Sequence, residues 1–312
     1  LGHARLAIVD VPGGQQPLAS DDGQIQAAVN GEFYDWERLR RDLESRGHHF
    51  RTRCDSELLI HLYEERGIDC LHELRGEFAF VLWDARKQRL FAARDRFGVK
   101  PLVYARGKRA QLYLASEAKA LFAMGLPAVW NAQAFAEVAS HQYLSPSQSL
   151  FGGVSMLPPG HYLLAEGSQW RTASYWSLDY PRRDEGATMS PAQEAAEIRA
   201  LLSESVRLRL QGDHPVACYL SGGIDSSAVA ALAVRHSQRP ISCFGIAFDD
   251  VAYDEHEDAA AFATALGVDF HAVRVSADAI VQTLPEAVRF AEGLCINGQL
   301  SAKFLLSKAT QA

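Results

Sequence analysis

Short apolar runs bounded by turn residues mark much of the chain up to about residue 125. Such runs are typical of strands that are buried on at least one face. They predict strands over residues 6–9, 24–29, 78–83, 89–93 and 112–115. Strands with only a few helices inserted between them favour an α+β domain over a repeated strand–helix–strand domain.

Between these runs the sequence predicts helices over residues 35–46, 57–66 and 117–122. In the first helix Leu39 and Leu43 are one turn apart, Asp35 can cap the start and Gly47 follows the end. The pair Asn30-Gly31, just before it, is typical of a two-residue hairpin turn. An alternating strand does not follow that pair, so we predict that the chain makes no hairpin there.

Prolines and glycines interrupt the pattern between residues 126 and 195. We expect a helix over residues 130–143, an extended segment over 154–164 and a polar, proline-containing linker over 177–191. The predicted organisation is therefore a first domain over residues 1–125, a connecting region over 126–195 and a second domain over 196–312.

Strands and helices alternate regularly in the last third of the chain. A helix over residues 192–211 places Ile198, Leu201, Leu202 and Val206 on one face. Strands over 216–220, 241–248 and 270–275 then alternate with helices that begin near Ser226, Asp254 and Ala277. This order predicts an α/β domain with a parallel sheet, whose ligands bind at the carboxyl ends of the strands.

Composition narrows the class of protein. The 312 residues carry a net charge of −7 and are 48% apolar, with no apolar run near the ~18 residues of a membrane span. An acidic chain of this kind does not indicate a nucleic-acid surface. Its five cysteines are scattered without a paired motif, which favours a reducing, cytoplasmic location over a disulfide framework or a zinc knuckle.

The segment Ser221-Gly222-Gly223-Ile224-Asp225-Ser226-Ser227 joins the buried strand over 216–220 to the next helix. A glycine turn between a strand and a helix directs several backbone N–H groups and the helix dipole at one point, which suits phosphate. It has neither the lysine of a Walker loop nor the G-x-G-x-x-G pattern. The alternative is an ordinary strand-to-helix turn with a serine cap.

This segment resembles the pyrophosphate loop, S-G-G-x-D-S, of the ATP pyrophosphatases. The first part of the chain resembles the glutaminase domain of glutamine-dependent asparagine synthetases, an N-terminal-nucleophile amidotransferase domain. The motifs that carry this second resemblance are residues 2–10, 16–18, 30–32, Asp55, 76–80, 94–102 and 115–121. The resemblance therefore implies an antiparallel α+β glutaminase domain followed by a parallel-sheet α/β ATP-pyrophosphatase domain.

The resemblance implies a role for each matching residue of the first domain. Arg5 would bind the α-carboxylate of glutamine, and Asp55, with Glu32 near it, the α-ammonium group. The Asn30 side chain and the Gly31 backbone N–H would form the oxyanion hole. The backbone of Leu6, Ala7, Ile8 and Val9 would line the same pocket. Without a functional role, Arg5 would be a surface charge and Asp55 a helix cap.

In the second domain the resemblance implies an ATP site. Leu220 and Ile246 would contact the nucleoside, and the residues for the pyrophosphate would be Ser221, Gly222, Gly223, Asp225 and Ser226. Asp225 could also ligate Mg²⁺, or be only an acidic residue interacting with the helix dipole. Asp254, Glu255 and His271 also match family positions, but no role follows from their chemistry. We expect a helix cap at Asp254-Glu255 and a core histidine at His271.

Two family features have no counterpart in this sequence. The family nucleophile is a cysteine at the mature N-terminus, and none of the five cysteines has that place. The family's second nucleotide segment, Ser-Gly-Glu-x-x-Asp-Glu, is also missing, and residues 292–307 follow the pattern of aspartate-using members only loosely. We therefore expect a fragment that by itself hydrolyses no glutamine and forms no amide.

The expected reaction of the whole enzyme converts ATP, aspartate, glutamine and water into AMP, pyrophosphate, asparagine and glutamate. It would proceed through β-aspartyl-AMP and channelled ammonia. Alternatives are a related lactam- or peptide-cyclising ligase that activates another carboxylate, and a catalytically dead relative. An α/β hydrolase using Ser221 would need G-x-S-x-G, and position 219 is Tyr. The expected partners are small molecules, without nucleic acid or membrane, and a homodimer is left open.

Overall fold

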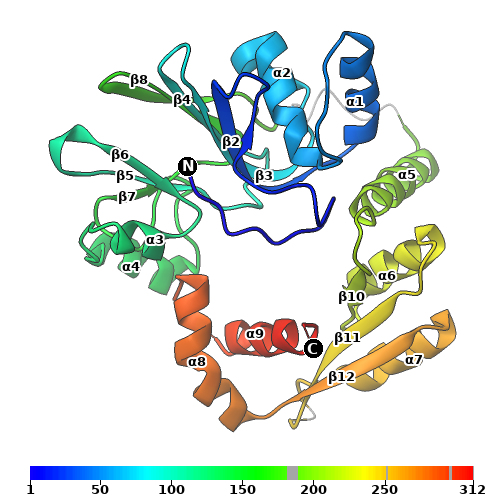
Figure 1. Ribbon diagram of the computed structural model, residues 1–312. Helices are drawn as coiled ribbons and strands as arrows, with labels where there is room; N and C mark the ends of the chain where they lie inside the picture. Colours follow the sequence, from blue (N-terminus) through cyan, green and yellow to red (C-terminus); the bar gives the residue numbers. More distant parts are fainter. Residues whose placement is uncertain (181–188, 251, 295–296, 312) are drawn as a thin grey trace. The chain divides into compact units, whose positions relative to one another are not determined.

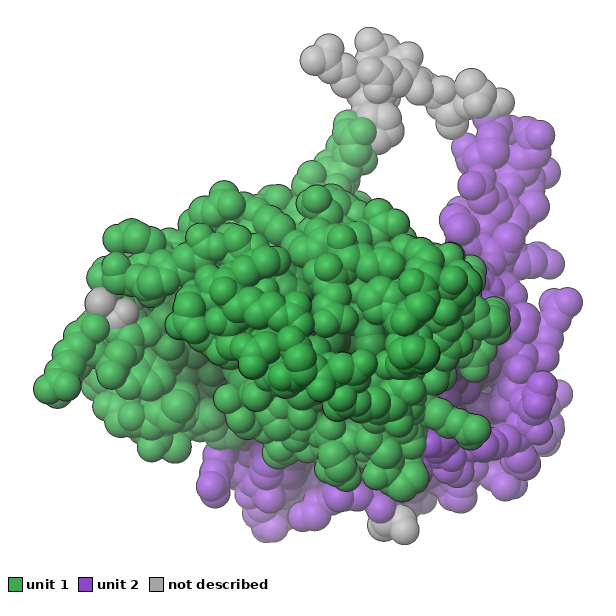
Figure 2. All heavy atoms as spheres, turned by 45° about the horizontal axis from the view of Figure 1, so that its top comes forward, with its two compact units in different colours: residues 1–180 green, residues 181–312 purple. Residues whose placement is uncertain are grey.

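The computed structural model describes residues 1–180, 189–250, 252–294 and 297–311 (Figure 1). The chain divides into two compact units, Leu1–Tyr180 and Pro181–Ala312 (Figure 2). Each unit has hydrophobic clusters of its own. The predicted linker falls at this division, but its residues 181–188 lie outside the described part of the chain.

Unit 1 is built on a six-stranded sheet in which every neighbouring pair is antiparallel. Its strands, in spatial order, are β1 (Leu18–Ala19), β2 (Ile25–Phe33), β3 (Gly76–Asp84), β4 (Arg89–Arg94), β8 (His161–Glu166) and β9 (Gln169–Ser174). This sheet confirms the antiparallel α+β class predicted for the first domain.

A second antiparallel sheet of unit 1 has the order β6-β5-β7. Its strands are β5 (Val103–Arg106), β6 (Leu112–Ala115) and β7 (Val154–Met156), and the helices of the unit are α1 (Trp36–Ser45), α2 (Leu58–Arg66), α3 (Ala118–Ala123) and α4 (Ala132–His141). Helix α2 packs against β2, and α1 against α2 (Figure 1). Leucines of the two helices and the stacked rings of Phe78 and Phe80 form the main core between helices and sheet.

Strand β2 runs straight through Asn30-Gly31, as the absence of a hairpin requires. Asn30 pairs with Ala79, and Gly31 with Phe78. Gly31 has a φ of 136°, and a Cβ there would lie 1.9 Å from the Glu77 carbonyl oxygen. The strand therefore reaches its full length because this position carries no side chain.

The strand predicted over residues 6–9 is wrong. The segment has no regular structure, and Leu6 is 91% exposed. The Arg5 side chain donates hydrogen bonds to the carbonyl groups of Val9, Asp10 and Val11. The segment is a loop whose last carbonyl group, that of Val9, binds the guanidinium and is not free to pair with another strand.

The predicted connecting region contributes strands to both sheets of unit 1. The extended segment over 154–164 is divided in the structure between β7 and β8, and β9 follows it. The apolar pattern missed β1, β5 and β9, of which β1 is two residues long and β9 is largely exposed. Short or exposed strands carry little periodic signal, so pairing with a neighbouring strand decides them.

Unit 2 has a three-stranded parallel sheet in the order β10-β11-β12. Its strands are β10 (Ala217–Tyr219), β11 (Ser242–Phe248) and β12 (Asp269–Val275), and its helices are α5 (Pro191–Arg209), α6 (Ile224–His236), α7 (His256–Leu266), α8 (Ala277–Ala291) and α9 (Gln299–Ala309). Buried alanines of α6 and α7 pack against the buried Cys218 and Cys243. The parallel sheet of the second domain is thus confirmed.

Helix α5 forms as predicted, but its predicted apolar face is not buried. Ser190 caps the helix in a capping box with Gln193. Ile198 and Leu201 are 65% and 64% exposed, and burial begins only near Val206. The C-terminal part of α5 therefore provides its apolar packing.

Two further expectations concern the cysteines and the membrane. The four cysteines that the structure describes are free and buried; Cys295 lies outside the described residues. No helix among the described residues has both the length and the apolar character to cross a membrane.

Candidate functional sites

Arg5 is held by backbone carbonyl groups of its own loop. Nη2 donates to the Val9 oxygen at 2.6 Å and to the Asp10 oxygen at 3.0 Å, and Nη1 to the Val11 oxygen at 3.1 Å. Nη2 also lies 3.8 Å from Cys54 Sγ. The guanidinium is therefore fixed against the segment that carries Asp55.

Asp55 opens the 3-10 helix Asp55–Glu57 that precedes α2, and it is 3% exposed. Oδ2 accepts the Phe33 backbone N–H at 2.7 Å, which ties the carboxylate to the end of β2. Burial raises the pKa of Asp55, and the Phe33 N–H acts in the opposite direction. Asp55 is a buried, oriented carboxylate and is not the N-cap of either helix, because Cys54 and Glu57 hold those positions.

Cys54 lies between these two charged residues, and the sequence analysis did not assign it a place. Its thiol is within 3.5 Å of Asp55 Oδ1 on one side and faces Arg5 on the other. Burial and the Asp55 charge raise its pKa, which favours the neutral thiol. Gly14 packs against Arg5 and Cys54 so closely that a side chain would not fit there, because a Cβ would lie 2.4 Å from Arg5 Nη2. The structure therefore brings Arg5 and Asp55 next to one buried thiol.

Asn30 lies three residues before Phe33 on β2, about 10 Å along the strand from the Asp55 contact. It lines a pocket of about 440 Å³ together with Leu1, Gly2 and His3. The structure shows no direct contact between Asn30 and either Arg5 or Asp55. Arg5 and Asp55 therefore lie near the end of β2, and Asn30 lies earlier on that strand.

The remaining residues predicted for glutamine differ in exposure. Leu6 and Ile8 are exposed, whereas Ala7, Val9 and Glu32 are intermediate. Of the backbone groups over residues 6–9, the Val9 carbonyl binds the Arg5 side chain. These side chains do not form an apolar wall, so any contribution of the loop to a ligand falls to its backbone.

The Ser221–Gly223 turn leaves β10 and opens α6. Gly222 has a φ of 79°, and a Cβ there would lie 3.0 Å from Asp258 Cβ on α7. Ser226 Oγ binds the Ser221 backbone N–H at 3.2 Å and donates to the Gly223 carbonyl oxygen at 3.0 Å. The turn is thus closed on itself by one serine and packed against α7 where only glycine fits.

Helix α6 begins with Gly223 as its N-cap, which has no side chain to bind the first-turn N–H groups. A helix start of this kind offers amide donors and a positive dipole end to an anion. Asp225 is in the first turn and is exposed. With Ser226, it lines a pocket of about 450 Å³ beside β10.

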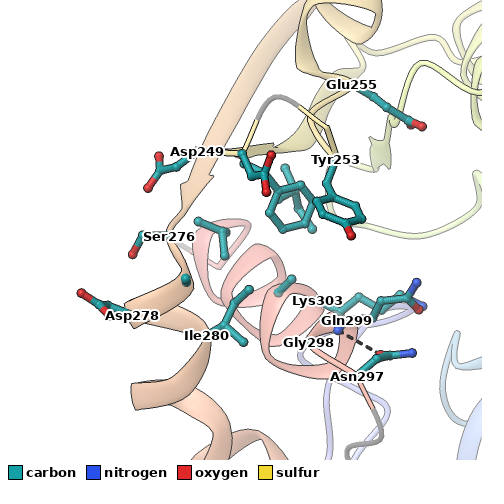
Figure 3. Close-up of a pocket in the computed structure, with 16 residues that line it drawn as sticks. Asp249, Tyr253, Glu255, Ser276, Asp278, Ile280, Asn297, Gly298, Gln299 and Lys303 are labelled. Carbon is teal, nitrogen blue, oxygen red and sulfur yellow. Dashed lines mark hydrogen bonds between the residues drawn. The ribbon is translucent and has the colours of Figure 1, made fainter.

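Ile246 lines a different and larger pocket of unit 2, of about 950 Å³ (Figure 3). This pocket lies beyond the carboxyl ends of β11 and β12. Asp249, Tyr253, Ser276, Asp278, Asn297 and Lys303 are among its lining residues. The structure therefore does not place Ile246 and Asp225 in one pocket. The rule that ligands bind beyond the carboxyl ends of parallel strands predicts a pocket at this place.

Asp254 and His271 have visible structural contacts. Asp254 accepts the backbone N–H groups of Phe248 and His256 and is 2.5 Å from His256 Nδ1. It therefore ties the end of β11 to the start of α7. His271 is exposed and stacks on Phe244, so the expectation of a core histidine is wrong. Glu255 lines the large pocket.

Two family profiles match the chain, one on each side of the predicted linker. The glutamine amidotransferase domain matches residues 1–176, and asparagine synthase matches residues 197–312. The chain belongs to the glutamine-hydrolysing asparagine synthetase family. This assignment confirms the predicted resemblance and its two fold classes.

Three family relatives show how far the likeness extends. Asparagine synthetase [glutamine-hydrolyzing] 3 of Bacillus subtilis is 34% identical over 310 residues, covering 92% of this chain and 49% of the relative. Asparagine synthetase [glutamine-hydrolyzing] 2 of the same organism is 39% identical over 244 residues, covering 74% and 32%. Amidase chry2 of Gibberella zeae is 38% identical over 309 residues, covering 94% and 45%. The chain thus spans about half the length of the first and third relatives and less of the second.

Proposed function

We propose that the protein containing this chain is a glutamine-dependent, ATP-consuming ligase that forms an amide bond. Its favoured product is asparagine, made from aspartate and the amide nitrogen of glutamine, with AMP, pyrophosphate and glutamate as the other products. The observation that carries the proposal is the Ser221–Gly223 turn, which opens a helix at a strand end and has Gly222 packed closely against α7.

Unit 1 would bind and position glutamine. Arg5 suits the α-carboxylate and Asp55 the α-ammonium, because each offers the opposite charge within one small region. Asn30 would meet the side-chain carbonyl further along β2, where its amide and the Gly31 N–H could donate to an oxyanion. Burial of Asp55 excludes water from the ammonium contact.

Unit 2 would bind ATP through the turn and the first turn of α6. Backbone N–H groups at the helix start would bind the phosphates, while Leu220 and Ile246 would contact the nucleoside. An exposed carboxylate beside a phosphate site fits the donors that Mg²⁺ takes, so Asp225 would hold the ion. Bound there, Mg²⁺ would neutralise phosphate charge.

A second candidate activates a carboxylate other than aspartate. It is favoured by the likeness to a relative named an amidase, which is 38% identical to this chain, against 34% and 39% for the two asparagine synthetases. The same turn and the same glutamine residues would serve it. Only the acceptor would differ, and the large pocket of unit 2 is the place to look for it.

The test is made in the full-length protein with Asp225→Asn and, as a matched control, Glu257→Gln, which changes an exposed acid in the first turn of α7. Asp225→Asn is expected to lower ATP-dependent pyrophosphate release by on the order of a hundredfold, with glutamine hydrolysis retained. The control should leave both rates unchanged. Parallel loss of both activities in a folded variant would make Asp225 structural.

The acceptor is tested separately by measuring pyrophosphate release with aspartate and with a panel of other carboxylates. Release that depends on aspartate, with asparagine found by mass spectrometry, supports the favoured product. Release that depends on another carboxylate assigns the second candidate. No ATP cleavage with any carboxylate would remove the ligase proposal itself.

A further inference from the structure

A cluster of histidines and glutamates lies where the end of α1 meets α2. His48 Nδ1 and His61 Nδ1 are 3.2 Å apart. Glu64 Oε2 lies 3.9 Å from the first nitrogen and 3.7 Å from the second. Among the described residues, these three side chains form one compact set of potential metal-ligand atoms.

The backbone holds all three residues in place. Helix α1 ends with Gly47 at a φ of 95°, and the His48 N–H bonds the Leu43 carbonyl oxygen at 3.1 Å. This is a Schellman-type end, which fixes the residue after the glycine. His61 and Glu64 are three residues apart on α2 and so share one face. The cluster is therefore built by a helix end and a helix face.

The outer nitrogens of both rings face carboxylates. His48 Nε2 is 3.1 Å from Glu65 Oε1, and Glu65 also pairs with Arg46. His61 Nε2 is 3.6 Å from Glu57 Oε1. A neighbouring carboxylate favours the proton on the nitrogen that faces it, as it does for metal-bound histidines. Glu65 therefore favours an unprotonated Nδ1 on His48, whereas His61 Nε2 makes no hydrogen bond at its distance from Glu57. The two facing Nδ1 atoms then hold either one proton between them or two lone pairs for a metal ion.

Two facing lone pairs beside a carboxylate repel one another unless a metal ion or a proton lies between them. Around a tetrahedral zinc ion with bonds of about 2.05 Å, two nitrogen ligands are roughly 3.3–3.4 Å apart. The observed 3.2 Å between the Nδ1 atoms is close to that spacing. Glu64 needs to approach by a few tenths of an ångström, and its side chain, which is 26% exposed, has room to turn.

We propose that Nδ1 of His48, Nδ1 of His61 and a carboxylate oxygen of Glu64 bind a divalent transition-metal ion of the Zn²⁺ class. A water molecule from the exposed side would complete four ligands. Glu65 and Glu57 would orient the rings from behind, and Arg86, 3.9 Å from the second Glu64 oxygen, would steady that side chain. The ion would clamp the end of α1 to α2 and stabilise unit 1.

The test uses the whole chain, stripped of metal with a chelator and titrated with Zn²⁺ against a chromophoric competitor. We expect one site whose affinity falls at least about tenfold in His48→Gln and in Glu64→Gln. His49→Gln is the matched control, because His49 is the exposed neighbour of His48, and it should bind like the parent. Zn²⁺ at about a hundred times its Kd should raise the Tm of unit 1 by roughly 5–10 °C.

His61 is buried, and a substitution there can prevent folding, so the decision rests on the two more exposed ligands. Unchanged affinity in both His48→Gln and Glu64→Gln, or no Tm shift with Zn²⁺ in the parent, would overturn the proposal. A proton shared by the two rings is the competing occupant. It would give a Tm that does not respond to Zn²⁺.

Discussion

The two candidate sites differ in what holds them. In unit 1 the charged residues are fixed by hydrogen bonds and burial: Asp55 is bound by Phe33, and Arg5 by three carbonyl groups. In unit 2 the turn is exposed and is shaped by the conformation of Gly222 and by Ser226. One site is made of oriented side chains, and the other of oriented backbone.

This difference follows from the ligands proposed for them. A small zwitterion such as glutamine needs a cation and an anion at fixed places, and buried charges keep their positions because a protein core is closely packed. A phosphate chain is bound by several N–H groups, which a glycine turn at a helix start supplies without charged side chains. Substitutions should therefore act differently in the two units.

The largest effect on stability is expected from Gly31→Ala. It combines a positive φ with a Cβ placed 1.9 Å from the Glu77 carbonyl oxygen, so it should lower the free energy of unfolding of unit 1 by about 3 kcal/mol or more. Gly222→Ala should cost unit 2 less, about 1–2 kcal/mol, because its nearest contact is 3.0 Å.

Urea unfolding, followed with a probe in each unit, measures both costs. Gly23→Ala is the control, since Gly23 has a φ of 69° with open space around its Cβ, and should cost only about 1 kcal/mol. An equal loss in all three variants would show that backbone strain alone matters and that the closeness of β2 and β3 does not.

The next effect concerns glutamine use in the full-length protein. Asp55→Asn removes the charge proposed for the ammonium while keeping a side chain that can accept the Phe33 N–H. The kcat/KM for glutamine should fall by about a hundredfold or more, with ATP cleavage retained. Asp35→Asn, at the residue that precedes α1 and whose side chain is 43% exposed, is the control. A glutamine kcat/KM unchanged in Asp55→Asn would contradict the ammonium role.

Asp55 also predicts a pH dependence. Burial raises its pKa above 3.8, so the folded state holds this proton more tightly than the unfolded state. The stability contribution of protonated Asp55 is therefore lost as the pH rises through the raised pKa, whereas binding of the ammonium is gained. The glutamine kcat/KM of the parent should rise over that interval, and Asp55→Asn should lack this rise.

A smaller effect is expected from Glu57→Gln in buffer containing a chelator. Burial raises the Glu57 pKa, but His61, Thr52 and two backbone N–H groups outweigh it, and the pKa lies below 4.5. The carboxylate should thus stabilise unit 1 by about 1–3 kcal/mol at pH 7. This contribution is present above 4.5 and is lost as the pH falls through the lowered pKa.

Thermal unfolding of Glu57→Gln across pH 3–7, with Glu37→Gln on the exposed side of α1 as control, measures this loss. The parent and the Glu57 variant should converge in stability at the acid end. A constant difference at every pH would mean that side-chain shape, and not charge, holds Thr52.

The smallest effect should be the same in both units. Asn131 caps α4 through the Ala134 N–H, and Ser276 caps α8 through the Ala279 N–H. Alanine at either position should cost about 1 kcal/mol, because a cap bond acts locally. Calorimetry of each variant checks this. A clearly larger loss of stability in one unit would show that the two units differ in the stability of their helices as well as in their sites.

The sequence by itself determined much of the architecture. The change from apolar runs to alternating strands and helices indicated an antiparallel unit followed by a parallel one, and the residues around Gly222 predicted the strand–turn–helix. Gly47 marked the end of α1. These features were readable because each depends on local spacing or on the conformational freedom of glycine.

Tertiary structure decided what depends on distant neighbours. Residues 6–9 are apolar, yet they form a loop that ends where Arg5 binds the carbonyl groups of Val9 and Asp10. Cys54 gained its position between Arg5 and Asp55 only through folding. The large pocket of unit 2 collects side chains from several elements, and His48 meets His61 across two helices. Periodicity reports which side of an element is buried, but only packing decides which side chains meet.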